Sequence, residues 1–565
     1  MPEYLTPGVY FEFLDTAPVV RGLRTDIAGF VGLAERGPLN EPVRMESLRQ
    51  FQGTFGNFIP NGYLAYAVKG FFENGGRTCF VVRIAGLTAA RSSLRLKNQL
   101  GQEVIQITAK NEGVWGDKMA VLLLTQPSRG EFSLIVAHDA RERESFSDLS
   151  VDPDSDRYFV RIVRDGDDRV GASRWIDAAV LPGLPPGVDL LPDPVASGLD
   201  NGGGFLTGGI DGIASLTVDD FIGDFSVLAP EKKGLSAFDG VDEVAIIAVP
   251  DIQIQPVPLT PPVPPPPEPP QDPCLPHSGL PPTATPFTPL PPEQPPLFSP
   301  ADVYAVQTAM IEHCEHYYDR VAVLDAPTRG GGATFSLSEI QSWRSGLESQ
   351  RGFGALYYPW VKVVDPIRVG GNPVRQVPPS GHIAGLYARG DLSIGVHKAP
   401  ANEELYWAED VTRVVNDEEQ GVLNPEGINC IRPFPGRGIR VYGARTVSSD
   451  SDWRYVNVRR LMSMIEEAID EATQWAVFEP HDYVIRQTLT ISISGFLSTL
   501  WQQGALVGAT PAEAYYVKCD DETNPPASVN EGKLITEIGV APTHPAEFIV
   551  FRIGRTVEEL EIVER

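Results

Sequence analysis

The sequence predicts a multidomain α/β protein with an extended segment at each end. Its 565 residues exceed what a single hydrophobic core serves, so two to four domains are expected. Strand, helix and strand follow one another repeatedly, which indicates α/β domains. The composition of 42% hydrophobic and 21% charged residues is typical of a folded globular chain.

Residues 1–24 predict an extended arm. Between two prolines, apolar and polar side chains alternate as they do in a strand, at Val9, Tyr10, Phe11, Glu12 and Phe13. A strand at the very end of a chain must find a sheet edge. That edge belongs either to its own domain or to a neighbouring subunit, and the pattern alone fits both.

Residues 25–88 predict an α/β core segment, and residues 89–205 an inserted β-rich domain. The first part reads as strand, short helix, longer helix and strand: IAGFVGLA, MESLRQFQGTFG, YLAYAVKGFFENGG and CFVVRI. The second part consists of short β-rich runs between Gly, Asp and Ser turns: VIQITAK, MAVLLLTQ, EFSLIVAHD and RYFVRIVRD.

Residues 206–350 predict a second α/β domain. DEVAIIAVPD and RVAVLDAP are buried strands on either side of the helix VYAVQTAMIEHCEHY, an order that implies a parallel crossover. A proline-rich insertion, residues 254–300, interrupts this unit; 21 of the 45 residues from Pro256 to Pro300 are proline. Such a segment cannot enter a helix or a sheet interior. It is expected to be a projecting surface loop, with a ligand for a proline-binding domain as the alternative.

Residues 351–544 predict a C-terminal domain, and residues 545–565 a second arm. Two helices in the domain carry apolar residues at helical spacing, WRYVNVRRLMSMIEEAIDEATQWAVFEP and TLTISISGFLSTLWQQGALVG. The closing strand contains Phe548, Ile549, Val550 and Phe551 and leads into an acidic tail.

Charge and cysteine content exclude several classes of protein. A formal net charge of −28 disfavours nucleic acid and anionic membranes as partners. The five cysteines form no CxxC pair, which argues against a disulfide framework or a zinc ribbon. Neither a secretory signal nor an apolar run of membrane-spanning length is evident, so cytoplasmic assembly without membrane insertion is expected.

The sequence favours no catalytic, cofactor or metal site. Ser380 and His382 lie too close in sequence for a convincing hydrolase triad, and neither GxSxG nor a phosphate-binding GxxxxGK[ST] loop occurs. The acidic runs DPDSD and DGDD lack the spacing of a calcium loop. A zinc site would have to combine a helix with the proline-rich loop, through His313, Cys314, His316, Cys274 and His277.

A set of motif-like runs covers nearly the whole chain apart from the proline-rich loop. Among them are YLTPGVYFEF, AGFVGLAERGPLNEP, NEGVWGDKMAV, LTGGIDG, VPPSGHIAGLYARGD, LNPEGINCIRPFPGRGIRVYGARTVSSD, FEPHD and GFLSTLWQQGALVGATPAEAYYVKCDDETN. Taken together, these runs resemble one protein family, the tail sheath proteins of contractile phages and extracellular contractile injection systems.

The resemblance implies a structural and mechanical role. Family subunits stack as hexameric rings in a helix around an inner tube, between a baseplate and a terminator or cap protein. Contraction of the helix drives the tube through a target envelope. The resemblance also implies an inner core built from the N- and C-terminal parts, a subtilisin-like middle domain and an outer β domain. Both arms would add strands to a neighbour's sheet, so deletion of residues 1–20 is expected to abolish polymerisation.

Three questions stay open at this stage. Arg454, Arg459 and Arg460 are candidates for the face that grips the tube, but internal ion pairs with Glu466 or Glu467 explain them equally well. A non-contracting particle scaffold is the second functional reading, and a subtilisin-like hydrolase the third. The kind of particle, whether phage tail, bacteriocin-like, extracellular or membrane-anchored, is not decided.

Overall fold

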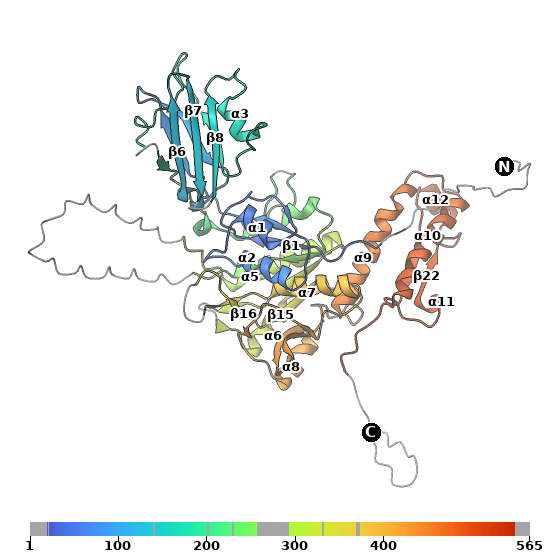
Figure 1. Ribbon diagram of the computed structural model, residues 1–565. Coiled ribbons are helices and arrows are strands. Elements are labelled where there is room, and N and C mark those ends of the chain that lie inside the picture. The colour runs from blue at the N-terminus through green and yellow to red at the C-terminus, as the bar shows by residue number, and fades with distance from the viewer. Residues whose placement is uncertain are drawn as a thin grey trace, which may run out of the picture.

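The structure is a computed structural model that describes residues 20, 22–138, 142–199, 203–228, 231–256, 293–329, 333–368 and 373–548. Figure 1 shows three parts, which we call the body, the β domain and the lobe. The body holds a large sheet with its covering helices, the β domain extends from β4 to β10, and the lobe extends from α9 to β23.

A nine-stranded sheet forms the centre of the body. The six strands from β20 to β3 are mutually parallel, and the strands outside them pair antiparallel. Across the sheet the order is β18 (Glu403–Glu404), β21 (Gly438–Tyr442), β20 (Ile428–Phe434), β15 (Gly354–Tyr358), β12 (Val321–Asp325), β11 (Ile246–Ala248), β1 (Ala28–Gly32), β3 (Cys79–Arg83) and β2 (Val43–Met45).

Helices cover both faces of this sheet, which explains why strands such as β1, β12 and β15 are buried at every position. In β12, Val321 and Val323 belong to one buried cluster, and Ala322 and Leu324 belong to the opposite one. The first cluster includes α1 (Leu48–Phe55), α2 (Leu64–Glu73) and α7 (Ser380–Ser393). The second includes α4 (Val218–Ile222), α5 (Pro300–Tyr317), α6 (Leu337–Gly346) and the end of α8 (Asp417–Leu423).

Two buried aspartates cap helices at the carboxyl ends of the parallel strands. The Asp251 carboxylate accepts a hydrogen bond from the backbone N–H of Leu33, directly after β1, at 2.7 Å. It also accepts from the backbone N–H groups of Tyr63 and Leu64 (3.3 Å) at the start of α2. Asp325 accepts one from the Ser380 N–H at the start of α7, at 2.8 Å. Burial raises the pKa of Asp251 to about 6 and that of Asp325 to about 7.

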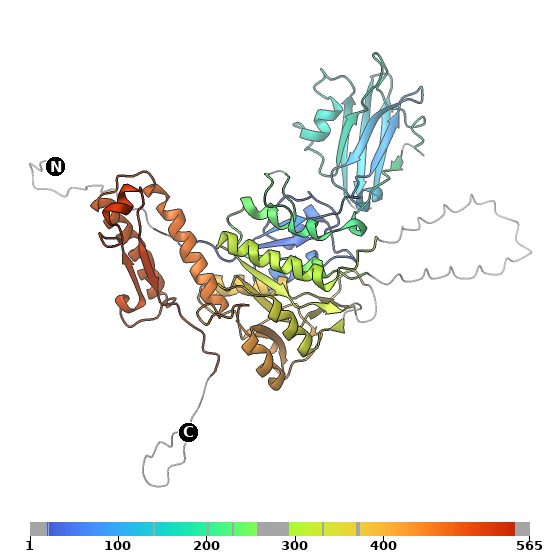
Figure 2. The same cartoon turned by 180° about the vertical axis from the view of Figure 1, so that it is seen from behind.

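The β domain has two small antiparallel sheets around a core of its own, and Figure 2 shows it set apart from the body's sheet. One sheet has the order β10 (Gly203–Phe205), β6 (Met119–Gln126), β7 (Glu131–His138) and β8 (Glu142–Ser150). The other has β4 (Ser93–Lys97), β5 (Glu103–Ala109) and β9 (Ile176–Val180), and helix α3 (Phe159–Asp165) packs beside them.

The lobe is built on two long helices and a hairpin. Its small core also takes Val20 and Leu23 from the segment before β1, although the sequence assigned both to the arm. The elements are α9 (Val456–Thr473), α10 (Tyr483–Gln502), α11 (Pro511–Ala514), β22 (Tyr515–Lys518), α12 (Pro526–Asn530) and β23 (Glu537–Val540). Among the described helices, none is at once long and apolar enough to cross a membrane.

Two expectations from the sequence are wrong. Residues 351–447 do not belong with the C-terminal helices, because β15, β20 and β21 complete the body's sheet. The run RYFVRIVRD forms α3 rather than a strand: Phe159, Ile162 and Val163 are buried at helical spacing.

The remaining strands form small sheets, β13 (Thr328–Arg329) with β14 (Ala333–Thr334), and β17 (Val374–Val377) with β16 (Val361–Val364) and β19 (Asp410–Val411).

Candidate assembly surfaces

Helix α9 joins the body to the lobe, and two buried arginines fix its first turns in the body. The Arg460 guanidinium donates to both carboxylate oxygens of Asp391, at 3.0 and 2.5 Å, and to the Thr25 carbonyl at 2.8 Å. It also stacks over the Tyr387 ring at 4.7 Å. The side chains of Arg460 and Asp391 are 3% and 7% exposed, so this is an internal ion pair.

Arg459 is enclosed still further. Its guanidinium lies between the rings of Phe353 (4.3 Å) and Trp453 (4.6 Å) and donates to Glu466 at 3.0 Å. Its side chain is fully buried. Stacking between aromatic faces offsets part of the cost of burying a guanidinium.

Of the two readings that the sequence left open for Arg459 and Arg460, these contacts favour internal ion pairs over a face that grips an inner tube. Both side chains point into the subunit, and for Arg459 the alternative ion pair with Glu466 is the one formed. Arg454 alone of the three is exposed. The sequence could not choose between the two readings because Phe353 and Asp391, which enclose the pair, are distant in sequence.

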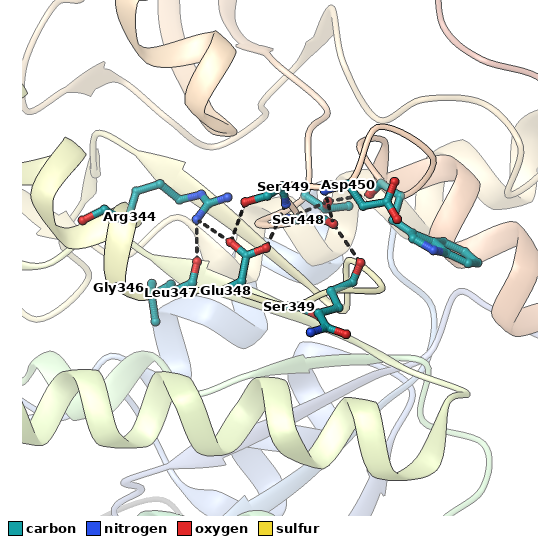
Figure 3. A network of polar contacts seen from close by, with 12 residues as sticks. Arg344, Gly346, Leu347, Glu348, Ser349, Ser448, Ser449 and Asp450 are labelled. Carbon is teal, nitrogen blue, oxygen red and sulfur yellow. Dashed lines mark hydrogen bonds and ion pairs between the residues drawn. The ribbon is translucent and has the colours of Figure 1, made fainter.

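The junction before α9 is held to the body by a polar network, shown in Figure 3. The Glu348 carboxylate accepts from the backbone N–H and the hydroxyl of Ser449, both at 2.9 Å. The Ser448 hydroxyl donates to the Gln350 carbonyl at 2.9 Å. Arg344 donates to the Leu347 carbonyl and lies 3.7 Å from the Glu348 carboxylate. The segment that leads into α9 is therefore held to the body at Ser448 and Ser449.

The far end of the lobe has the opposite character, because apolar groups are left uncovered there. Val477, Phe478, Tyr483 and Val484, in and after the α9–α10 turn, are 59%, 102%, 73% and 66% exposed. Phe478 also has a positive φ of 69°, which a bulky side chain rarely adopts. The turn lies in the run WAVFEPHDYV, whose FEPHD segment carries part of the family resemblance, and the sequence did not predict an exposed apolar turn there.

A groove of about 750 Å³ lies beside this turn. It is lined by apolar side chains of α9, α10 and the approach to β23, among them Ile469, Ile485, Leu489, Ile493, Leu534 and Ile538. The adjoining sheet contains only β22 and β23 within the described chain, so one long edge of each strand has no strand partner there. Unpaired edges of this kind are templates for an added strand.

Most of the predicted arm residues lie outside the described residues. This applies to Val9, Tyr10, Phe11, Glu12 and Phe13, and to Ile549, Val550 and Phe551. Phe548 is described, and it is 77% exposed.

His382 and His313, which the sequence offered for catalysis and metal binding, pack against other side chains of the body. His382 is buried and stacks on Trp407 with ring centroids 5.6 Å apart, and burial lowers its pKa to about 4. The His313 Nε2 atom lies 3.2 Å from the Arg320 guanidinium, a poor neighbour for a cation. In the part of the chain that the structure describes, no three His, Cys, Asp or Glu side chains gather in a metal-binding arrangement. Cys274 and His277 lie outside it.

Comparison with known proteins decides what this architecture belongs to. The model of the phage tail sheath protein central domain matches residues 297–447, and that of the phage tail sheath C-terminal domain matches residues 448–556. The chain belongs to the phage tail sheath family. This family is structural and not enzymatic, and the border between its two matched domains falls in the junction before α9.

Individual sheath proteins extend the similarity. The putative prophage major tail sheath protein of Pseudomonas aeruginosa (strain UCBPP-PA14) is 29% identical over 45% of this chain and 62% of its own length. The tail sheath protein of Vibrio phage KVP40 is 26% identical over 40% of this chain and 35% of its own length. The matches thus span only part of these relatives. The contracted helical sheath of the anti-feeding prophage has the same fold, with a TM-score of 0.54, 21% identity, and coverage of 98% of this chain and 100% of that one.

Proposed function

We propose that this chain is the repeating subunit of a contractile sheath. Subunits stack as hexameric rings in a helix around an inner tube, between a baseplate and a terminator or cap protein. Contraction of this helix drives the tube through a target envelope. Assembly begins in the cytoplasm, and the product is part of a phage tail or of an injection particle. Family membership supports the sheath role.

The observation that carries the assembly mechanism is the unfinished sheet of the lobe. β22 and β23 pair only with each other in the described chain, and an apolar groove lies alongside. The arms, residues 1–24 and 545–565, contain runs that alternate or concentrate apolar residues as strands do. A strand from a neighbouring subunit would satisfy the main-chain groups of an open edge and cover the groove.

The proposed mechanism also assigns roles to the other parts. The subtilisin-like α/β unit and the β domain lie outward from an inner core that faces the tube. Exposed Arg454 stays a candidate tube contact, whereas Arg459 and Arg460 fix α9 in the body. The energy for contraction is stored in subunit packing at assembly, as two arrangements of one sequence.

Negative-stain electron microscopy of the purified chain over a concentration series tests this proposal. We expect hollow striated tubes with sixfold end views, in a long narrow form and a short wide form. Tubes of a single form under all conditions would favour a non-contracting scaffold. Dispersed particles at every concentration, even with the tube and baseplate proteins present, would contradict the sheath role.

A further inference from the structure

The last described residues cross from the lobe back to the body. After β23, Thr543 is held from three sides: its N–H donates to the Ala505 carbonyl (3.1 Å), its hydroxyl to the Gly504 carbonyl (2.9 Å), and its own carbonyl accepts from Asn457 (3.0 Å). From this point the chain runs along the body to Phe548 and the C-terminal arm. Residues 544–548, which we call the strap, are therefore the root of that arm.

One ion pair holds the strap to the body. The Glu547 carboxylate accepts two hydrogen bonds from the Arg445 guanidinium, at 2.9 and 2.5 Å, and the two side chains are 15% and 10% exposed. Arg445 is itself fixed, because its backbone N–H and carbonyl both bond to the Asn429 side chain, each at 2.7 Å. The anchor on the body is thus rigid.

The rest of the strap is weakly attached. Within the described residues, His544 to Phe548 make no backbone–backbone hydrogen bond. The His544 and Tyr455 rings meet edge to face, with centroids 5.9 Å apart. Pro545 has no N–H to donate. The strap borders a cleft of about 480 Å³ whose far side includes Gln420, Arg432 and Tyr442. Because the strap has so few other bonds, it stays on the body while the Arg445–Glu547 ion pair is formed and comes away when that pair breaks.

We propose that the Arg445–Glu547 pair is a releasable clasp that sets the free length of the C-terminal arm. With the clasp closed, the strap is held to the body; with it open, the whole strap is released and lengthens the arm. The five residues of the strap extend its reach by about 17 Å. This inference rests on the proposed function, since reach matters only if the arm binds a neighbour whose distance changes when the sheath contracts.

A spin label at position 548 tests the clasp directly. The label is attached to Phe548→Cys in a Cys274→Ser background, because the other four cysteines are buried. The dispersed subunit should give an immobilised spectrum. Glu547→Gln keeps the shape of the side chain but removes its charge, and should shift the equilibrium about tenfold toward the mobile spectrum. The matched control is Glu531→Gln, which loses an exposed pair with Lys533 and should leave the spectrum unchanged.

The same label is then followed in assembled tubes. We expect an immobilised label in one of the two sheath forms and a mobile label in the other. Equal mobility in the dispersed wild type and Glu547→Gln, or identical spectra in both sheath forms, would overturn the clasp while leaving the sheath role intact. Failure of the wild-type chain to form tubes, even with the tube and baseplate proteins present, would instead overturn the proposed function, and with it the release of the clasp.

Discussion

The body and the lobe differ in how completely they bury their strands. In the body, β1, β3, β12 and β15 are buried at every position, between two layers of helices. In the lobe, β22 and β23 have no fully buried position. A two-stranded hairpin is marginally stable by itself in water. The difference teaches that the body is complete within one subunit, whereas the lobe has surfaces that a neighbour can complete.

The boundary between the two regions is as informative as the regions themselves. The first turns of α9 are fixed by Arg459 and Arg460 inside the body, while its later turns pack against α10 in the lobe. Motion of the body therefore carries the lobe with it. Under the proposed function, connections between subunits are then assigned to the arms.

Removal of the N-terminal arm should have the largest effect, because tube formation would be lost while the subunit stays folded. Deletion of residues 1–19, which spares Val20 in the lobe's core, should abolish tube formation and leave the subunit folded. Electron microscopy and circular dichroism measure the two properties. Deletion of an equally long stretch of the proline-rich segment, residues 261–279, is the control and should leave assembly intact. Normal tubes from the arm deletion would rule out strand exchange by this arm.

Loss of the Arg460 ion pair should destabilise the body next most strongly. Arg460→Ala leaves the Asp391 carboxylate buried without its cation, which costs about 3–5 kcal/mol in the free energy of unfolding. Urea denaturation of the dispersed subunit measures this loss. The exposed Arg454→Ala is the matched control, with an expected change within about 0.5 kcal/mol. A stable Arg460→Ala variant would show that the start of α9 does not depend on this pair.

The pH dependence of stability should reveal the buried carboxyl groups of the body. The folded pKa of Asp325 is raised to about 7, above its usual value of 3.8, so the folded state binds more protons than the unfolded state between these values. The contribution of Asp325 to stability therefore decreases as pH rises from about 4 to about 7. As pH rises over this range, the free energy of unfolding of Asp325→Asn should increase relative to that of the wild type, by an amount on the order of a few kcal/mol. Parallel pH profiles of the two proteins in urea denaturation would contradict the assignment.

The exposed turn of the lobe should give the smallest change in the isolated subunit. Phe478→Asn loses no buried surface and relieves the positive φ, so the free energy of unfolding should rise by about 1 kcal/mol. Assembly should nevertheless weaken, seen as a higher concentration needed for tube formation. An unchanged assembly threshold would mean that Phe478 has no role in subunit contacts.

The buried strands of the body could be predicted from the sequence because their pattern is local. Runs such as VAIIAV and VAVLD are apolar at consecutive positions, and the structure confirms them as β11 and β12, with α5 between them. That residues 354–358 add the next parallel strand depends on pairing across the sheet, which no local pattern encodes. The sequence boundary at residue 351 was wrong for that reason.

The candidate site was less predictable than the fold. Two consecutive arginines on a helix usually indicate a solvated face, and here they are buried by Phe353, Tyr387 and Asp391 from distant segments. One signal pointed inward: the apolar positions around them, from Val456 to Ile465, occupy most of the helix circumference. The partner of Glu547 in the strap likewise lies more than a hundred residues earlier, at Arg445.

The most direct test is a cryo-electron microscopy map of assembled tubes, examined at the β22–β23 edges of each lobe. The account predicts that strands from neighbouring subunits pair with these edges and that the groove beside β23 is covered. Tubes in which β22 and β23 stay two-stranded, or in which each arm pairs with its own lobe, would contradict it.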